Sequence, residues 1–225
     1  KKLEIDGFQV FFYTSNSMLI NNENIFYWDI ENGIFDKAPL VKCSHIIHLS
    51  GYGVINKWTQ KNKKKMYFSR VDAANLLFHY CKEKKINIKT FISASAIGYY
   101  GFDSVGIKEE SDLPSNDWLS ELAVDWEKSA TNFKEINSRV IKLRISLIFT
   151  KLSGFLKPIL LSMKFGVAPI LGKRGQSFEW IHLDDLSSFI LFSLKNKDVT
   201  GPYNLATESK TNQEEFLNII KNKYF

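Results

Sequence analysis

The stretch KTFISASAIGYYG, residues 89–101, predicts a buried strand that ends in a cluster of hydroxyl groups. Similar apolar or β-branched runs, each short enough for a strand, lie at residues 9–14, 25–28, 45–50 and 139–149. Segments with helical periodicity separate them, chiefly Thr59 to Lys84 and Asp117 to Ile136. Strands that alternate with helices long enough to cross over predict an α/β fold with a parallel, doubly wound sheet.

The pattern changes after Thr150. A helix is expected at 155–164, followed by a stretch broken by glycine and proline at 166–175 and a short strand at 178–182. A helix at 183–194, a strand at 203–206 and a helix at 212–223 complete the chain. We therefore expect residues 1–150 to form the main domain and residues 151–225 a smaller cap region interwoven with it.

Composition narrows the class of protein. The 225 residues are 44% hydrophobic, which is enough for a real core, and the net charge is +6. The basic run from Lys61 to Lys65 is better explained as a solvated helix face than as a nucleic-acid site. Cys43 and Cys81 lie far apart, so neither disulfides nor a metal site are expected. Without a membrane-spanning run or a signal peptide, the sequence predicts a cytoplasmic protein with no membrane or nucleic-acid partner.

Ligands of open parallel sheets bind at the carboxyl ends of the strands, so the residues that follow each strand are the first candidates. Thr14 and Ser15 follow the first strand and would contact the adenosine ribose in a dinucleotide site, although on this pattern alone a hydrophilic turn explains them better. Asp29 follows the second strand. Its carboxylate suits an adenine amino group, or it caps a helix N-terminus.

The third and fourth strand ends carry the remaining candidates. Leu49, Ser50 and Gly51 include small residues that let a backbone approach a ligand closely. Ser95, Tyr99 and Tyr100 carry hydroxyls that can polarise a carbonyl or relay a proton. The alternative for the tyrosines is packing with solvated hydroxyls. The histidines show no spacing typical of a metal site or of a Ser-His-Asp triad.

Several short motifs occur in one order along the chain. They are Trp58-Thr59, Ser69-Arg70, Ser95 to Gly101, Trp126-Glu127, Leu143-Arg144, and Gly175-Gln176 through Asp185. This series resembles the atypical extended short-chain dehydrogenase/reductases known as epimerase family proteins, also described as YfcH-like or cell-division-inhibitor-like. The resemblance implies a Rossmann-type fold that binds a nucleotide cofactor, usually NADPH. It also implies that Leu49 and Ser50 lie beneath the cofactor and that Lys65, Arg70 and Ile148 contact it.

The sequence departs from that family in three ways. No glycine-rich strand and turn of the G-x-x-G-x-x-G type is present, so the first βα unit of the cofactor site is missing. Thr14-Ser15 stands where a Ser-Arg pair would bind a 2′-phosphate, which makes NAD a candidate beside NADP. Trp118 and Leu122 replace the usual Tyr-x-x-x-Lys pair, which leaves Ser95 with Tyr99 or Tyr100 as the candidate catalytic groups.

The resemblance predicts an NAD(P)-dependent epimerase or oxidoreductase. Its small-molecule substrate, for which a nucleotide sugar is the leading class, would lie between the carboxyl edge of the sheet and the cap. The alternative is a non-catalytic module that senses a dinucleotide or binds a protein, as the loss of the Tyr-Lys pair suggests. Because the chain starts at Lys1 without a methionine, we also expect it to be a fragment of a longer protein.

Overall fold

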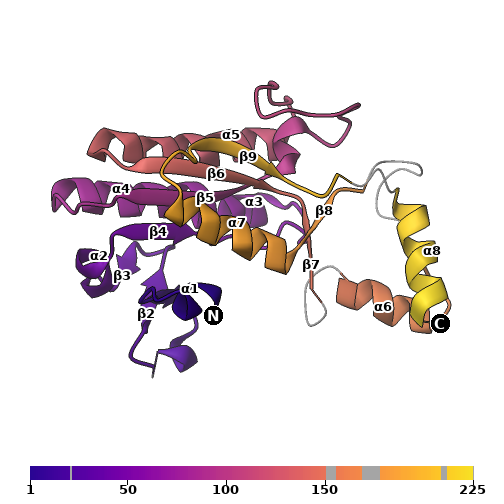
Figure 1. Cartoon of the computed structure of the whole chain (residues 1–225), viewed down its shortest axis with the longest axis horizontal. Coiled ribbons are helices and arrows are strands. Elements are labelled where there is room, and N and C mark those ends of the chain that lie inside the picture. The colour runs from indigo at the N-terminus through magenta and orange to yellow at the C-terminus, as the bar shows by residue number, and fades with distance from the viewer. Residues whose placement is uncertain (21, 151–155, 169–177, 209–211, 225) are drawn as a thin grey trace.

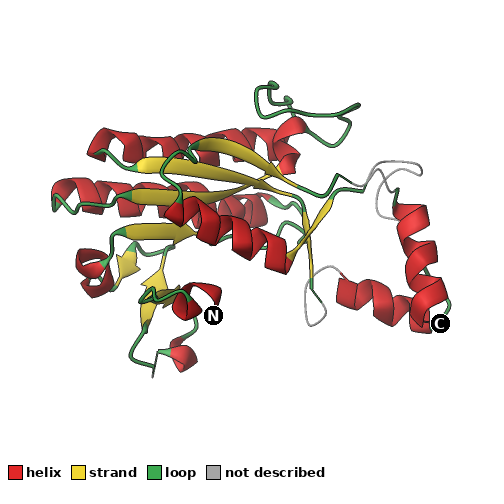
Figure 2. Ribbon diagram, in the orientation of Figure 1, coloured by secondary structure: helices red, strands yellow, loops and turns green. Residues whose placement is uncertain are grey.

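The computed structural model describes residues 1–20, 22–150, 156–168, 178–208 and 212–224. Its main sheet has the strand order β4-β5-β6-β9 with every pairing parallel. The strands are β4 (His45–His48), β5 (Thr90–Ala96), β6 (Arg139–Ile145) and β9 (Gly201–Leu205). All four arrows point to the right-hand side of Figure 2, so their carboxyl ends share one edge.

Helices cover both faces of this sheet, as Figure 1 shows. One face carries α3 (Gln60–Tyr67), the π-helical turn η2 (Phe68–Asp72), α4 (Ala73–Glu83), α5 (Trp118–Thr131) and η4 (Asn132–Ile136). The other face carries α7 (Leu183–Lys195). Successive side chains of β6 point to opposite faces of the sheet. Ile141 and Leu143 pack with α7, whereas Val140 packs with the helices on the other face. The predicted doubly wound sheet is confirmed.

The predicted helix at 59–84 forms with one irregular turn. Thr59 caps α3 by accepting a hydrogen bond from the Asn62 amide at 3.2 Å. The five residues of η2 then continue into α4. Single π-helical turns inside α-helices often occur at functional sites. This turn carries Ser69 and Arg70, which belong to one of the sequence motifs.

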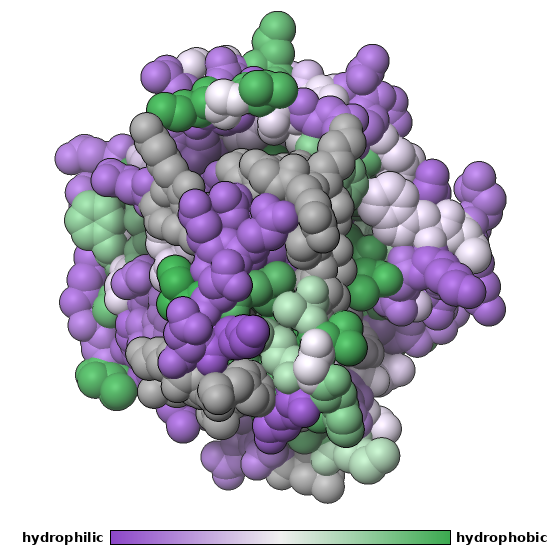
Figure 3. All heavy atoms as spheres, turned by 90° about the vertical axis from the view of Figure 1, so that its right-hand side faces the viewer, coloured by the Kyte–Doolittle hydropathy of each residue, from purple (hydrophilic) through white to green (hydrophobic). Residues whose placement is uncertain are grey.

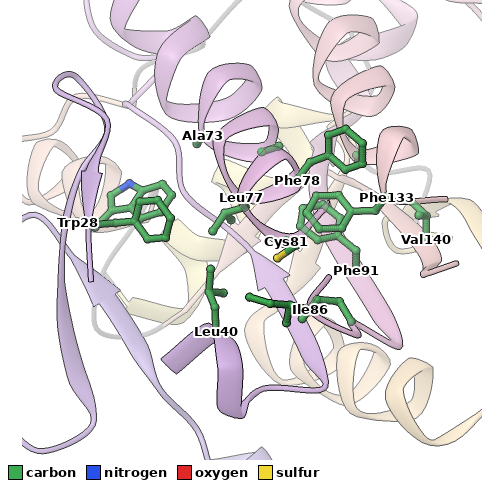
Figure 4. Packing of buried hydrophobic residues seen from close by; sticks show 14 residues of the cluster. Trp28, Leu40, Ala73, Leu77, Phe78, Cys81, Ile86, Phe91, Phe133 and Val140 are labelled. Atoms are coloured by element: carbon green, nitrogen blue, oxygen red, sulfur yellow. The ribbon is translucent and has the colours of Figure 1, made fainter. Parts of the chain in front are cut away.

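The largest core cluster lies between the main sheet and α4, α5 and η4. Figure 4 shows Phe91 of β5 stacked on Phe133 of η4, with ring centroids 3.7 Å apart, and Leu77, Phe78 and Cys81 of α4 around them. Each such side chain contributes about 1.5–3 kcal/mol when fully buried. This burial fixes the helices on which the candidate site depends.

A smaller sheet with the order β1-β2-β3 extends the fold beyond β4. Its strands are β1 (Phe12–Thr14), β2 (Ile25–Asp29) and β3 (Ile34–Phe35), and η1 (Ser17–Leu19) follows β1. Trp28, Phe35 and Leu40 of α2 (Ala38–Lys42) pack into the large core cluster. Within the described residues no strand pairing joins this sheet to β4, and β1 and β4 each pair with one strand only.

The ends of the chain lie against α7 and beyond the carboxyl edge. Helix α1 (Lys2–Ile5) contacts α7 through Lys2 Nζ, which donates to Asp184 O at 2.7 Å. The predicted strand at 139–149 divides at Ser146, whose hydroxyl donates to Leu205 O at 2.7 Å, into β6 and β7 (Leu147–Phe149). Strand β7 pairs with β8 (Trp180–His182).

Two helices, α6 (Leu156–Lys164) and α8 (Gln213–Tyr224), form the outer part of the region after Thr150. They share a small cluster that contains Ile159, Met163, Leu217 and Ile220. Figure 3 views this side of the molecule, where hydrophobic residues lie among hydrophilic ones. Gly175-Gln176 and most of the predicted 166–175 stretch lie outside the described residues. None of the helices in the described ranges is long and apolar enough to cross a membrane.

Candidate functional site

The carboxyl edge brings together side chains from β5, β6, α5 and β9. In the parallel register Ser95 lies opposite Arg144, and Ser93 lies opposite Lys142. Side chains two apart on a strand share one face, so Lys142 and Arg144 both reach the face covered by α5. There they meet Glu127, the residue after Trp126 in the α5 motif.

Glu127 is the centre of a buried network. Its Oε1 accepts from Arg144 Nε at 2.7 Å and from Ser95 Oγ at 2.9 Å. Its Oε2 accepts from Arg144 Nη2 at 3.1 Å and lies 3.2 Å from Lys142 Nζ. Glu127 is 5% exposed and Arg144 is 2% exposed. The Ser95 hydroxyl therefore donates its proton to a carboxylate of the protein itself.

The charges of this pair reinforce one another. Burial alone favours the neutral acid, but the hydrogen bond from Arg144 and the charges of Lys142 and Arg144 lower the pKa of Glu127 below its ordinary value. Burial likewise opposes the charged form of Arg144, yet its hydrogen bonds to Glu127 and Tyr100 raise the pKa of the guanidinium. Both groups stay charged in the folded protein.

Tyr100 ties the network to the loop that follows it. The 3-10 turn η3 (Ile97–Tyr100) continues directly from β5. The Tyr100 hydroxyl accepts from Arg144 Nη1 at 2.7 Å and lies 2.7 Å from Asn204 Oδ1 and 2.9 Å from Glu109 O, its two acceptors. Tyr100 is thus a buried connection between β5, β6, β9 and the loop.

Tyr99 behaves differently from its neighbour. It is half-buried, and no described residue hydrogen bonds to its hydroxyl. The Arg144 guanidinium lies over its ring, 3.6 Å from the centroid. Its backbone carbonyl accepts from Ser120 Oγ at 2.5 Å. The ring and the backbone are held, while the hydroxyl remains available.

The loop after β4 has its own hydrogen-bond chain. The Ser50 hydroxyl donates its single proton to Ser69 O at 2.7 Å. His48 Nε2, 2.8 Å from Ser50 Oγ, must therefore carry the proton of that contact. This leaves His48 Nδ1 as a buried acceptor without a partner among the described residues. Burial, together with the nearby Arg70 charge, lowers the pKa of His48 to about 4, so the ring is neutral.

Arg70 clamps this loop from the η2 turn. Its Nη1 donates to Tyr52 O at 3.0 Å and to Met66 O at 3.1 Å. A Cβ on Gly51 would lie 2.8 Å from Arg70 Nη2, so the glycine is required by the chain's own arginine. Arg70 is 8% exposed, and in the described part of the chain it has no ion pair. Burial lowers its pKa to about 10.

The remaining sequence candidates lie around these two clusters. Lys65 Nζ is 3.4 Å from Glu31 Oε1, across from the loop after β2. Asp29 accepts from the Asn32 amide group at 2.8 Å, so it caps a turn and not a helix. Leu49 is 54% exposed. Thr14 Oγ1 accepts from the Asn16 amide at 3.1 Å, Ser15 is exposed, and Ile148 lies half-buried in β7.

The structure also places the residues that replace the Tyr-Lys pair. Trp118 opens α5 and packs on Trp58, with ring centroids 5.5 Å apart, while Lys63 lies over its ring. Leu122 is buried in the core. Beside them, an open pocket of about 540 Å³ is lined by Tyr100, Phe102, Lys108, Ser115 and Asp117 among other residues.

Sequence reasoning missed the roles of Glu127 and Arg144. Both belonged to motifs that were noticed, Trp126-Glu127 and Leu143-Arg144, but no role was assigned to either residue. The available signal was the basic residues Lys142 and Arg144 inside a strand expected to be buried, since such residues are seldom buried unless paired.

Three comparisons bear on the ancestry of this site. The chain is 30% identical over 207 residues to the epimerase family protein SAR0825 of Staphylococcus aureus, an alignment that covers 90% of this chain and 68% of that protein. The structure resembles the nucleoside-diphosphate sugar epimerase of Corynebacterium glutamicum with a TM-score of 0.82 and 23% identity, covering 99% of this chain and 46% of that one.

The structure also resembles human epimerase family protein SDR39U1 with NADPH, with a TM-score of 0.81, 20% identity and coverage of 98% of this chain and 73% of that one. At such identities the likeness supports the fold. The model of the NAD dependent epimerase/dehydratase family matches residues 4–206. The chain therefore belongs to the NAD dependent epimerase/dehydratase family.

Proposed function

We propose that this chain binds a nicotinamide dinucleotide and acts as an epimerase or oxidoreductase on a nucleoside diphosphate sugar. The observation that carries the proposal is Arg70, a buried cation on η2 that contacts the loop after β4 and has no carboxylate partner among the described residues. A buried charge without a counter-ion is costly, and a cofactor phosphate would supply one. The family match and the nucleotide-bound relative support the same ligand class.

The residues around Arg70 fit such a cofactor. Gly51 lets the backbone of the β4 loop approach a phosphate, and exposed Leu49 offers an apolar surface to a ring. Ser50 belongs to the same loop, and Lys65 Nζ lies 5.7 Å from the ring centroid of Tyr52 in that loop. When bound, the nicotinamide ring supplies hydride transfer; the protein's residues bind it, orient it and manage the proton.

The seat also needs donors for the pyrophosphate, which a glycine-rich turn at a helix N-terminus usually provides. Within the described residues, no strand pairing joins the β1-β2-β3 sheet to β4. We infer that a strand–turn–helix unit lying between them would complete the seat. Strand pairing there would satisfy the open edges of β1 and β4.

For the cofactor type we infer a preference for NAD over NADP. The turn after β1 offers the hydroxyls of Thr14 and Ser15, and residues 14–17 include no arginine or lysine to pair with a 2′-phosphate. Glu31 already neutralises Lys65 at 3.4 Å. Fluorescence titration of the protein with NADH and NADPH tests this: tighter binding of NADH is expected, and tighter binding of NADPH would overturn the inference.

The substrate is proposed to lie in the open pocket beside Tyr100, which is lined by residues between 100 and 117. Carboxylate, hydroxyl and ammonium groups from Asp117, Ser115 and Lys108, together with the Phe102 ring, suit a polar ligand with a sugar ring. The free thiols of Cys43 and Cys81 support a reducing, cytoplasmic setting.

The function is tested by incubating the protein and NAD with a panel of nucleoside diphosphate sugars and following the absorbance of the NADH formed. A titration with NADH to saturation measures cofactor binding in parallel. Cofactor binding with turnover of one sugar is expected. Binding without turnover of any sugar would favour the second candidate, a non-catalytic module that senses a dinucleotide or binds a protein. Trp118 and Leu122 in place of the Tyr-Lys pair are the observation that favours this second candidate.

A further inference from the structure

Four hydroxyls lie at or near the end of β5, and three of them are used inside the protein. Ser93 Oγ donates to Ala94 O at 2.8 Å and is fully buried. Ser95 donates to Glu127, and Tyr100 lies between Arg144, Asn204 and Glu109. The Tyr99 hydroxyl is the one that no described residue occupies.

The surroundings of Tyr99 hold it next to the first turn of α5. Its carbonyl accepts from Ser120 Oγ at 2.5 Å and from the Ser115 amide at 3.1 Å. Ser120 lies two residues after Trp118 and two before Leu122, the positions that a Tyr-x-x-x-Lys pair would take. The backbone of Tyr99 is therefore fixed against the first turn of α5, which carries Trp118 where the usual tyrosine is absent.

Arg144 supplies the cation of this arrangement. Its guanidinium stacks on the Tyr99 ring at 3.6 Å. Its Nε and Nη2 donate to Glu127, and its Nη1 donates to Tyr100 and to Glu110 O. With each of its nitrogens engaged and 2% of its surface exposed, Arg144 positions the phenol and does not itself contact substrate.

We propose that Tyr99 is the group that exchanges a proton with the substrate, and that the Arg144–Glu127 pair is its positioning unit. The inference rests on the proposed function. In the oxidative direction Tyr99 would act as the base that takes the proton of a substrate hydroxyl, and bound NAD would supply the acceptor for the hydride released when the C–H bond of that carbon breaks. The carbon is oxidised to a carbonyl and the nicotinamide is reduced; the reverse step returns hydride and proton.

The first test needs no turnover. N-acetylimidazole acetylates accessible phenols, and peptide mass mapping locates the modified residues with and without UDP-glucose and NAD. Tyr99 is expected to be acetylated and to be protected at least fivefold by the two ligands together, whereas buried Tyr100 stays unmodified. Exposed Tyr67, at the end of α3, should react equally in both samples and serves as the internal control. An unreactive Tyr99, or one that the ligands do not protect, would overturn the proposal.

The second test compares hydroxyl deletions in single-turnover NAD reduction by the best sugar of the panel. Tyr99→Phe should slow the step by about 100-fold or more with NADH affinity unchanged, because positioned acid–base groups contribute about 10²- to 10⁴-fold. Ser95→Ala should stay within about fivefold. Tyr80→Phe, on α4 and away from the strand ends, is the matched control. A Tyr99→Phe protein that keeps the wild-type rate would sink the assignment.

The positioning role of Arg144 has its own readout. Arg144→Lys keeps a cation but loses the planar stacking, and Arg144→Met loses both. If Arg144 positions Tyr99, Arg144→Lys should recover at least tenfold of the rate lost in Arg144→Met while both bind NADH equally. Equal rates in the two variants would exclude that role. Should the wild-type protein turn over no sugar, the proposed function fails, and the acetylation pattern alone decides whether Tyr99 is a ligand-contacting group.

Discussion

Two buried arginines flank the candidate site and are satisfied in opposite ways. Arg144, at the end of β6, has a carboxylate on two of its nitrogens and a pKa raised by those bonds. Arg70, on η2 beside the loop after β4, donates to backbone carbonyls and has a pKa lowered to about 10 by burial. The first charge is paired with a carboxylate, whereas among the described residues the second is not.

This difference predicts that Arg144 mainly supports the folded structure, whereas Arg70 is available to a ligand. Around Arg144, a change of charge disrupts the protein itself, because the partner Glu127 is buried with it. Around Arg70, backbone dipoles orient the guanidinium but leave its charge for an anion. The two regions therefore differ in their proposed roles: Arg144 holds the proposed proton-exchanging residue in place, and Arg70 is the cation that we propose binds a cofactor phosphate.

The largest effect is expected when Glu127 is removed, because Arg144 would then be a buried cation without a carboxylate partner, as Arg70 is among the described residues. Glu127→Ala leaves Arg144 and Lys142 without their counter-ion, and we expect the free energy of unfolding in urea to fall by about 3–5 kcal/mol. The double variant Glu127→Leu with Arg144→Met should lose much less, since the buried guanidinium is removed together with the carboxylate and only Lys142, whose side chain is 20% exposed, loses its partner. A single variant as stable as the wild type would contradict the closed nature of this pair.

Acidification separates the two regions by a second route. The folded pKa of His48, about 4, lies below its ordinary value of 6.5, so the unfolded chain binds more protons between these values. Stability attributable to His48 is therefore full above about pH 6.5 and is lost as pH falls towards 4, by about 3 kcal/mol in total.

The measurement is urea unfolding at pH 7 and pH 5 for the wild type and His48→Gln. The variant should show a smaller drop between the two pH values, whatever its stability at pH 7. Glu127 contributes in a lower window, because its pKa is depressed and its stabilisation is lost only as pH falls below its ordinary value of 4.5. An equal drop in both proteins would show that His48 titrates normally.

Removing the charge of Arg70 tests its availability to an anion. Arg70→Met should weaken NADH binding by about tenfold or more, in line with the loss of a charge-assisted hydrogen bond. Arg139→Met is the matched control, because Arg139 also donates to a backbone carbonyl, Val199 O at 2.6 Å, but at the start of β6. Equal affinity in the wild type and Arg70→Met would place the phosphates elsewhere.

The smallest effect is expected at the exposed pair beside Arg70. The Glu31 and Lys65 side chains are 57% and 35% exposed, so Glu31→Gln should change stability by less than about 1 kcal/mol. Freed from Glu31, Lys65 should strengthen NADPH binding about two- to threefold at low salt, and added salt should remove the gain. A loss of NADPH affinity would indicate that Glu31 itself contacts the cofactor.

The fold was accessible from the sequence because most of its elements have clear periodicity. Strand β5 was expected at 89–95 and lies at Thr90–Ala96, and the long helix was expected at 59–84 and spans Gln60 to Glu83. The two residues of β3 were missed, because they form a strand only by pairing antiparallel with β2. Short α2 was missed for a similar reason, since its burial depends on the core it meets.

The site was accessible only in part. Its position followed from the rule that ligands bind at strand ends, which located Ser95, Tyr99 and Tyr100. Their different fates depend on Arg144 lying opposite Ser95 in the sheet register and on Glu127 reaching both. Such pairings join residues 17 and 32 positions apart in sequence, and no local pattern specifies them. The cofactor contacts proposed for Thr14, Ser15, Asp29, Leu49, Lys65 and Ile148 remain predictions.

Because η2 is a π-helical turn, the number of residues in it sets how α3 and Ser69 are oriented toward the loop after β4. One residue on a helix corresponds to about 100° of rotation. Deleting a residue such as Val71 would let the turn revert to α-helical hydrogen bonding while the core fixes α4. The residues of α3 and η2 before the deletion would then rotate together, so that Lys65 would lose its contact with Glu31 and Ser69 its contact with Ser50. A chain that lost this one residue would lose the contacts of Lys65 and Ser69 together.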